Sequence, residues 1–314
     1  KFNDLIKSQI IKQDNRVNID LEDVFVKLNI KEKSLSINTS NLNFYILKEK
    51  QEISNVDILI GLEALIQKDL NIKKIIINSK KNKIDELLKF IRTYKVSIPA
   101  LYLENSISKG KIIYNINSTF KNNKLDQVEL SGQIFDAELN ILGKDKLENV
   151  NLNFNYENKN IEIINLKVKN NNLNFIRKNI KIKINDDLIK VKGDIKNKLN
   201  LGLISKFINY NFNNYIDSKT LFNSQSTFNF SITKRFKLKE FDIKSKISND
   251  ELKMNFKELE FKDYIKNFKN KIIFKNNDIN LNINKDKIKI ELNSNFALNK
   301  NNKFKNILIN YSKN

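Results

Sequence analysis

Residues 152–168 read LNFNYENKNIEIINLKV, which is an alternating segment, a polar turn and a second apolar segment. In the first segment Leu152, Phe154 and Tyr156 alternate with asparagine. A period of two between apolar and polar residues is typical of a strand with one buried face. The turn Glu157-Asn158-Lys159-Asn160 joins the two segments directly, so the stretch predicts an antiparallel hairpin.

The same pattern recurs along most of the chain, with polar turns at intervals of about ten residues. The expected strands lie at 24–30, 35–37, 42–46, 72–77, 112–120, 128–134, 137–141, 152–156, 161–168, 180–184, 228–232, 241–243, 252–256, 281–283, 288–292 and 307–311. Too few helices separate them for a parallel sheet, which needs a crossover helix between partners. With only 6 Gly in the chain, we expect Asn to take the left-handed backbone positions of the turns.

Three segments show helical spacing instead. We expect short helices at 62–70 and at 203–208, and a longer one at 84–95, where Ile84, Leu87, Leu88 and Ile91 form one apolar face. Acidic residues in its first turn and basic residues in its last turn match the helix dipole. The single proline, Pro99, predicts a boundary between an N-terminal β-α module, 1–99, and a repeating antiparallel segment, 100–314.

The composition argues against an enzyme. The 314 residues include no His and no Cys, which removes the common proton shuttle, the thiolate nucleophile and the usual zinc ligands. The adjacent acids Glu22-Asp23 and Asp186-Asp187 would point to opposite faces of a strand and so make poor carboxylate pairs. We therefore expect no catalytic residue, no metal site and no cofactor.

The net charge of +21 raises the question of a nucleic-acid partner. Nearly all of the surplus is Lys, and it accompanies heavy use of Asn and Ile, as AT-rich coding would produce. Proteins that recognise specific nucleic-acid sequences normally combine Arg with stacking aromatic residues in an organised patch, and no such motif is visible here. We expect no nucleic-acid partner.

A long sheet with one apolar face has to cover that face. The sheet can close on itself as a packed core, or it can curl into a trough whose lining is covered by something apolar such as acyl chains. The long run of strands, lined by Ile, Leu, Phe and Val with almost no Pro to form corners, favours the trough. The fold class expected is mainly β with a few short helices, an elongated and curled antiparallel sheet that forms a β-groove.

Two sets of residues resemble the AsmA-like family. Val56–Ile77 reads as strand, short helix and strand, which is similar to the N-terminal module of that family. Val128-x-Leu130-x-Gly132-x-Ile134 and Ile189-x-Val191-x-Gly193-x-Ile195 resemble its recurring strands. The similarity runs over most of the chain.

The resemblance implies a non-enzymatic, bridge-like carrier that moves phospholipid along an apolar β-groove between the bacterial inner and outer membranes, in outer-membrane biogenesis. Acyl chains would be its ligands, and it would lie in the periplasm, held at the inner membrane by an N-terminal anchor outside this segment, with an outer-membrane partner at the far end. The groove lining implied by the apolar phase of the strands is Val128, Leu130, Ile134, Leu152, Phe154, Ile161, Ile163, Phe228, Phe230, Leu252, Met254 and Phe256. The alternative is a structural or adhesive β-repeat segment of an exported protein, in which the same residues form a closed core.

Overall fold

The structure is a computed structural model, and it divides the chain into two compact units, Lys1–Leu166 (unit 1) and Lys167–Asn314 (unit 2). The residues that it describes are 3–4, 7–8, 11, 14–30, 33–62, 72–122, 124–141, 145–170, 173–176, 179–185, 187–200, 216–217, 220–233, 235, 237–255, 271–298 and 303–313.

The described elements are almost all strands. Those that begin in unit 1 are β1 (Val17–Asp20), β2 (Asp23–Asn29), β3 (Ser34–Ile46), β4 (Glu49–Gly61), β5 (Ile72–Ser79), β6 (Asn82–Lys83), β7 (Ile107–Lys121), β8 (Lys124–Ile141), β9 (Asp145–Glu157) and β10 (Asn160–Asn170), with helices α3 (Ile84–Tyr94) and α4 (Ile98–Ser106) between β6 and β7. Unit 2 contains β11 (Leu173–Ile176), β12 (Asn179–Ile184), β13 (Leu188–Asn200), β14 (Leu221–Thr233), β15 (Leu238–Asn255), β16 (Lys271–Asn284), β17 (Ile288–Ala297) and β18 (Lys305–Lys313).

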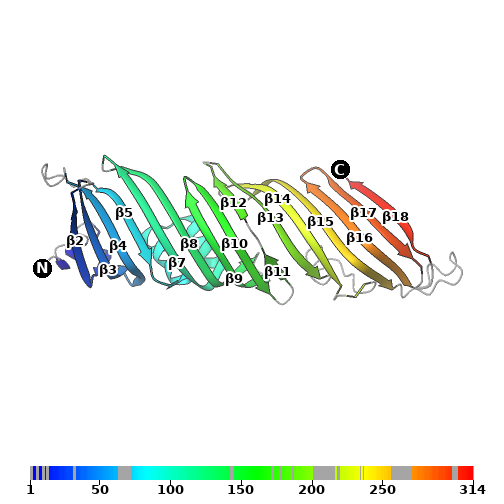
Figure 1. The fold of residues 1–314 in the computed structure, drawn as a ribbon, viewed down its shortest axis with the longest axis horizontal. Coiled ribbons are helices and arrows are strands. Elements are labelled where there is room, and N and C mark those ends of the chain that lie inside the picture. The colour runs from blue at the N-terminus through cyan, green and yellow to red at the C-terminus, as the bar shows by residue number, and fades with distance from the viewer. Residues whose placement is uncertain are drawn as a thin grey trace. The chain divides into compact units, whose positions relative to one another are not determined.

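The strands of unit 1 form an antiparallel sheet in which most neighbours in sequence are neighbours in space. β2, β3, β4 and β5 pair in order, β5 pairs with β7 across the helical insertion, and β7, β8 and β9 continue the series (Figure 1). Short strand β1 pairs with the second half of β3, while β2 pairs with its first half. The sheet is therefore a meander interrupted once, by α3 and α4.

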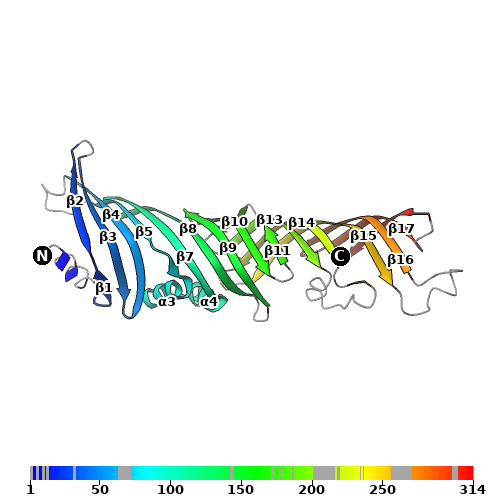
Figure 2. The same cartoon turned by 60° about the horizontal axis from the view of Figure 1, so that its bottom comes forward.

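Both helices lie against one face of the unit 1 sheet, as Figure 2 shows beneath β5, β7 and β8. α3 has the predicted apolar stripe, with Ile84 and Leu88 buried, and its first turn carries Asp85 and Glu86 as the dipole rule requires. α4 was not expected, because Pro99 suggested a boundary. Proline is tolerated in the first turn of a helix, and here Ser97 caps that turn by accepting a hydrogen bond from the Ala100 N–H at 3.3 Å.

Unit 2 contains a second antiparallel meander. β12 pairs with β13, and the pairs β13–β14, β14–β15, β15–β16, β16–β17 and β17–β18 follow in order (Figure 1). Short strand β11 pairs with the second half of β13 and with the end of β10. The mainly β, antiparallel fold class predicted from the sequence is confirmed.

Several strands change their phase of alternation at a residue with left-handed backbone. In β8 the apolar phase passes from Ile134 to Ala137, and Asp136 between them has φ of 49° with a shift of register toward β9. In β16 the phase passes from Phe274 to Ile279, and Asn276 has φ of 52° beside a shift of register toward β17. These are β-bulges, which insert a residue and keep the apolar side chains on one face.

The bulges correct one expectation. Segments 128–134 and 137–141 belong to one strand, β8, because Phe135 and Asp136 between them form a bulge and no turn. Segments 241–243 and 252–256 likewise share a strand, β15, which extends to Asn255. The expected use of Asn for left-handed backbone in turns is confirmed at Asn122 and Asn158. Asn also adopts this backbone inside strands, at Asn41, Asn149, Asn165 and Asn276.

Two expected helices fall outside the described residues, since 63–71 and 201–215 are not among them. The boundary at Pro99 was expected from the sequence pattern, whereas the division after Leu166 follows from the compactness of the two units. The two-domain division at residue 99 stays a prediction.

Candidate functional site

The apolar face of the unit 1 sheet is built from residues that lie directly opposite one another on neighbouring strands. Three such rows cross β7, β8 and β9: Ile116–Leu130–Tyr156, Tyr114–Gly132–Phe154 and Ile112–Ile134–Leu152. Opposed side chains of an antiparallel sheet share a face, so the predicted lining residues of β8 and β9 are brought together. All seven predicted lining residues of unit 1, from Val128 to Ile163, are half-buried.

α3 covers part of this face. The buried side chains Leu42, Ile53, Ile112 and Tyr114 pack with Ile84 and Leu88 of the helix in one cluster. Leu130, Ile134 and Phe154 touch the edge of that cluster and are only partly buried. The apolar face of unit 1 is therefore a closed core under α3 and a half-buried surface at Leu130, Ile134 and Phe154 of β8 and β9, whereas Ala137 and Val150 of the same strands are buried.

The opposite face of the same strands is polar and internally hydrogen-bonded. Asn117 Nδ2 donates to Glu129 Oε2 at 2.9 Å, and Gln127 Nε2 donates at 3.1 Å to both Glu129 Oε1 and Glu157 Oε1. These side chains cross β7, β8 and β9 in the phase that alternates with the apolar rows. The sheet has one apolar face and one polar face, and their assignment follows the alternation read from the sequence.

The predicted lining of unit 2 also shares one face. Phe228 lies opposite Gly193 and Ile243, and Phe230 lies opposite Val191 and Phe241. The Phe228 and Phe230 rings stack with centroids 5.9 Å apart. Further along the sheet Leu252 lies opposite Phe274, and Met254 opposite Ile272. Phe228, Phe230, Leu252 and Met254 are half-buried, and Phe256 lies outside the described residues.

The two glycines of the recurring motif have a common role on this face. A Cβ on Gly132 would stand 2.7 Å from the ring of Phe154, and a Cβ on Gly193 would stand 2.9 Å from the ring of Phe228. Each glycine thus leaves room for a lining phenylalanine on the adjacent strand to lie over its backbone. Aromatic rings placed over glycine on a neighbouring strand are a known means of fixing strand register.

A row of small polar side chains interrupts the apolar face of unit 2, and the sequence reasoning missed it. The Ser226 and Ser245 hydroxyls are 2.7 Å apart, and those of Ser224 and Ser226 are 3.2 Å apart. Toward β17 the buried Ser294 hydroxyl donates to Asn277 Oδ1 at 2.6 Å. The signal was present in the sequence, because Ser224, Ser226 and Ser245 occupy the apolar phase of their strands.

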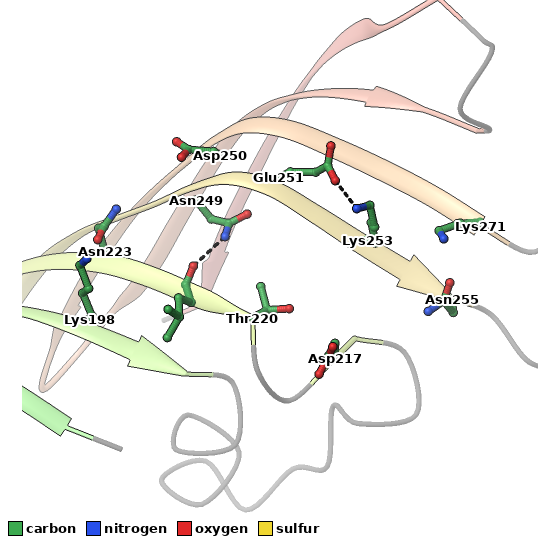
Figure 3. A pocket seen from close by; sticks show the side chains of 11 residues that line it. Lys198, Asp217, Thr220, Asn223, Asn249, Asp250, Glu251, Lys253, Asn255 and Lys271 are labelled. Atoms are coloured by element: carbon green, nitrogen blue, oxygen red, sulfur yellow. Dashed lines mark hydrogen bonds and ion pairs between the residues drawn. The ribbon is translucent and has the colours of Figure 1, made fainter. Parts of the chain in front are cut away.

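Unit 2 also has a polar cleft of about 590 Å³, shown in Figure 3. Its lining comprises Lys198, Asp217, Thr220, Leu221, Asn223, Asn249, Asp250, Glu251, Lys253, Asn255 and Lys271. Asn249 Nδ2 donates to the Leu221 carbonyl at 2.7 Å, and Glu251 pairs with Lys253. In the described part of the chain, no group of three Asp or Glu side chains could hold a metal ion. The cleft is lined mainly by charged and polar side chains, so it is unsuited to an acyl chain.

One titratable group lies in the core of unit 1. Burial raises the pKa of the Tyr114 hydroxyl to about 12, because the phenolate would lose its hydration. Its backbone N–H donates to Ser79 Oγ at 2.7 Å, which ties β7 to the end of β5. Tyr114 is thus part of the packed support of the face.

None of the helices within the described residues is long and apolar enough to cross a bilayer. Comparisons with known proteins gave no matching family model, no matching curated protein and no matching solved structure.

Proposed function

We propose that this chain is a non-enzymatic carrier segment that holds phospholipid acyl chains on the apolar face of its antiparallel sheets. The observation that carries the proposal is the partial burial of the predicted lining residues and their position on neighbouring strands. Every one that is described is half-buried, and they lie side by side across neighbouring strands. A core closed by a second layer would bury such side chains fully, as α3 does for Leu42 and Ile53.

The energetics of the face suit reversible binding. Each methylene moved from water to an apolar contact gains about 0.8 kcal/mol, so the affinity for a tail grows with the length of chain in contact. Apart from the serine row of unit 2, the lining is aliphatic and aromatic and repeats from strand to strand, so neighbouring positions within each apolar stretch offer similar binding energies. A lipid can therefore be retained without being fixed at one place.

The resemblance to the AsmA-like family extends the proposal to a cellular compartment and a direction of lipid transport. On that basis the segment belongs to a periplasmic protein, anchored in the bacterial inner membrane, that passes phospholipid toward the outer membrane. The short motif strands that carry the resemblance, around Gly132 and Gly193, support it. Both place a glycine opposite a lining phenylalanine in the same way.

The structural β-repeat remains the second candidate, and the closed cluster under α3 favours it for the first half of unit 1. In that reading the apolar faces only stabilise the segment. The two functions differ in whether anything other than protein contacts Phe154 and Phe230.

Site-specific photocrosslinking tests the proposal. In the purified chain, with no bilayer present, a photoreactive amino acid is placed at Phe154 and at Phe230, and its matched controls are placed at Asn155 and Asn229, which are exposed neighbours on the opposite faces of β9 and β14. We expect phospholipid adducts from the two phenylalanine positions and none from the controls. Adducts at neither pair, or equal adducts at both, would exclude the carrier function and favour the structural segment.

A further inference from the structure

The positive charge of the chain is concentrated in unit 2. Residues 1–166 contain 25 Lys and Arg against 22 Asp and Glu, a net charge of +3, whereas residues 167–314 contain 32 against 14, a net charge of +18. AT-rich coding would enrich Lys in both units alike. The difference between the units therefore calls for an explanation in structure.

Many of the surplus lysines of unit 2 project from the polar face of one part of its sheet. They alternate with the apolar residues of β12, β13 and β15, and all are exposed. We call them the lysine face: Lys181, Lys183, Lys190, Lys192, Lys196, Lys198, Lys244 and Lys246.

The register brings these lysines close together. Lys181 lies directly opposite Lys192, and Lys183 directly opposite Lys190. On the next strands Lys196 and Lys246 flank Gln225 from either side. Paired strands are about 4.8 Å apart and alternate residues of a strand about 6.6 Å apart, so the ammonium groups form a two-dimensional array with nanometre-scale spacing or less.

Few acids balance this array. In the same phase, the described parts of β12 to β15 carry Asp194, Glu240, Asp242 and Asp250, and Asp242 lies 3.7 Å from Lys244. Like charges directly opposite one another destabilise a sheet. Lys183 and Lys190 form such a pair on this exposed face, and an anionic surface that neutralises it would stabilise the sheet.

The chemistry of the face distinguishes between anionic partners. The positions between the lysines on β14 are Asn223, Gln225, Thr227, Asn229 and Ser231, so this part of the face has no aromatic ring on which a base could stack. Lysine supplies compact charges without the bidentate geometry of arginine. An extended, even layer of phosphate groups matches the charge and the spacing of the ammonium groups on the lysine face.

We propose that the lysine face of unit 2 docks on the surface of an anionic phospholipid bilayer. Polybasic segments gain about 1 kcal/mol per Lys or Arg near such a surface. The docking uses the polar face of the sheet and needs no acyl chain on the apolar face. It is therefore independent of the carrier function, and either proposal can fail while the other holds.

Vesicle co-sedimentation of the full chain tests the docking at about 0.15 M salt. The probes are vesicles of phosphatidylcholine alone and vesicles that contain phosphatidylglycerol in addition. The test variant carries Lys181→Gln, Lys183→Gln, Lys190→Gln and Lys192→Gln. The matched control carries Lys27→Gln, Lys48→Gln, Lys121→Gln and Lys124→Gln, four exposed positions of unit 1, so both variants have the same net charge. Thermal melts establish that both are folded.

We expect the unchanged chain and the control to bind the anionic vesicles, and the test variant to bind them at least about tenfold less tightly. Binding that is equal on neutral and anionic vesicles would overturn the proposal. So would an equal loss in the two variants, which would reveal a net-charge effect only. Tighter binding to a DNA duplex than to anionic vesicles at the same salt would assign the face to nucleic acid instead.

Discussion

Tyr114 is a residue whose ionisation reports on the integrity of the unit 1 core. It is 8% exposed and packs with Ile53, Ile84 and Leu88 beneath α3. Below pH 10 its hydroxyl is protonated in both the folded and the unfolded chain. Between pH 10 and about 12 the unfolded chain releases the proton while the folded chain keeps it.

The free energy of unfolding should therefore fall as the pH rises from about 10 to 12, and Tyr114→Phe should remove part of that fall. The measurement is the change in melting temperature of unit 1 between pH 9 and pH 11, for the unchanged chain and for the variant. Tyr94→Phe, at a tyrosine of the same unit that is 60% exposed, serves as the control for removal of a hydroxyl. An unaltered pH dependence in Tyr114→Phe would contradict the buried environment of this hydroxyl.

At the scale of elements, the β-bulges decide which side chains reach the apolar face. Asn276 is exposed and adopts φ of 52° where β16 shifts its register against β17. A side chain branched at Cβ is disfavoured in the left-handed region by about 1–2 kcal/mol or more, whereas glycine has no such penalty. Without this bulge, Phe274 and Ile279 would lie on opposite faces of the strand.

We expect Asn276→Val to lower the stability of unit 2 by about 1–2 kcal/mol, and Asn276→Gly to leave it nearly unchanged. Denaturant unfolding of the two variants beside the unchanged chain is the measurement. If valine proved as stable as glycine at this position, the bulge would not depend on left-handed backbone.

The elements also show where the sequence was informative. Alternation placed most of the described strands and their apolar face, because the period of two is a direct consequence of extended backbone. It wrongly divided β8 at Asp136, because a one-residue change of phase resembles the end of a strand when the neighbouring strands are not known. It missed α4, because Pro99 marks a helix start as readily as a boundary and only the Ser97 cap distinguishes the two.

The candidate site was predictable to a similar extent. The lining residues on β8, β9, β14 and β15 could be read from the alternation, and the register confirms that they share a face in each unit. The polar row of Ser224, Ser226 and Ser245 was missed, because the predicted lining included apolar residues alone, although the three serines occupy the apolar phase of their strands. The lysine face was missed for another reason: local charge looks uniform along the chain, and the imbalance emerges only when the two units are compared.

At the scale of the whole molecule, the apolar face and the polar face of the sheet require binding partners of different chemistry. The apolar face requires an occupant made of hydrocarbon, and a charge placed there should expel it. An unpaired carboxylate that loses its water costs several kcal/mol, so Phe230→Asp should empty the face near β14. Asn229→Asp adds the same charge one residue away, on the polar face, and is the matched control.

The most direct test of the carrier function is to extract the purified chain with organic solvent and to quantify phospholipid by mass spectrometry. We predict phospholipid in an amount comparable with the protein from the unchanged chain and from Asn229→Asp, and a loss of most of it from Phe230→Asp. A folded, unchanged chain that yields no phospholipid, or an equal yield from all three proteins, would contradict the claim that the apolar face holds acyl chains.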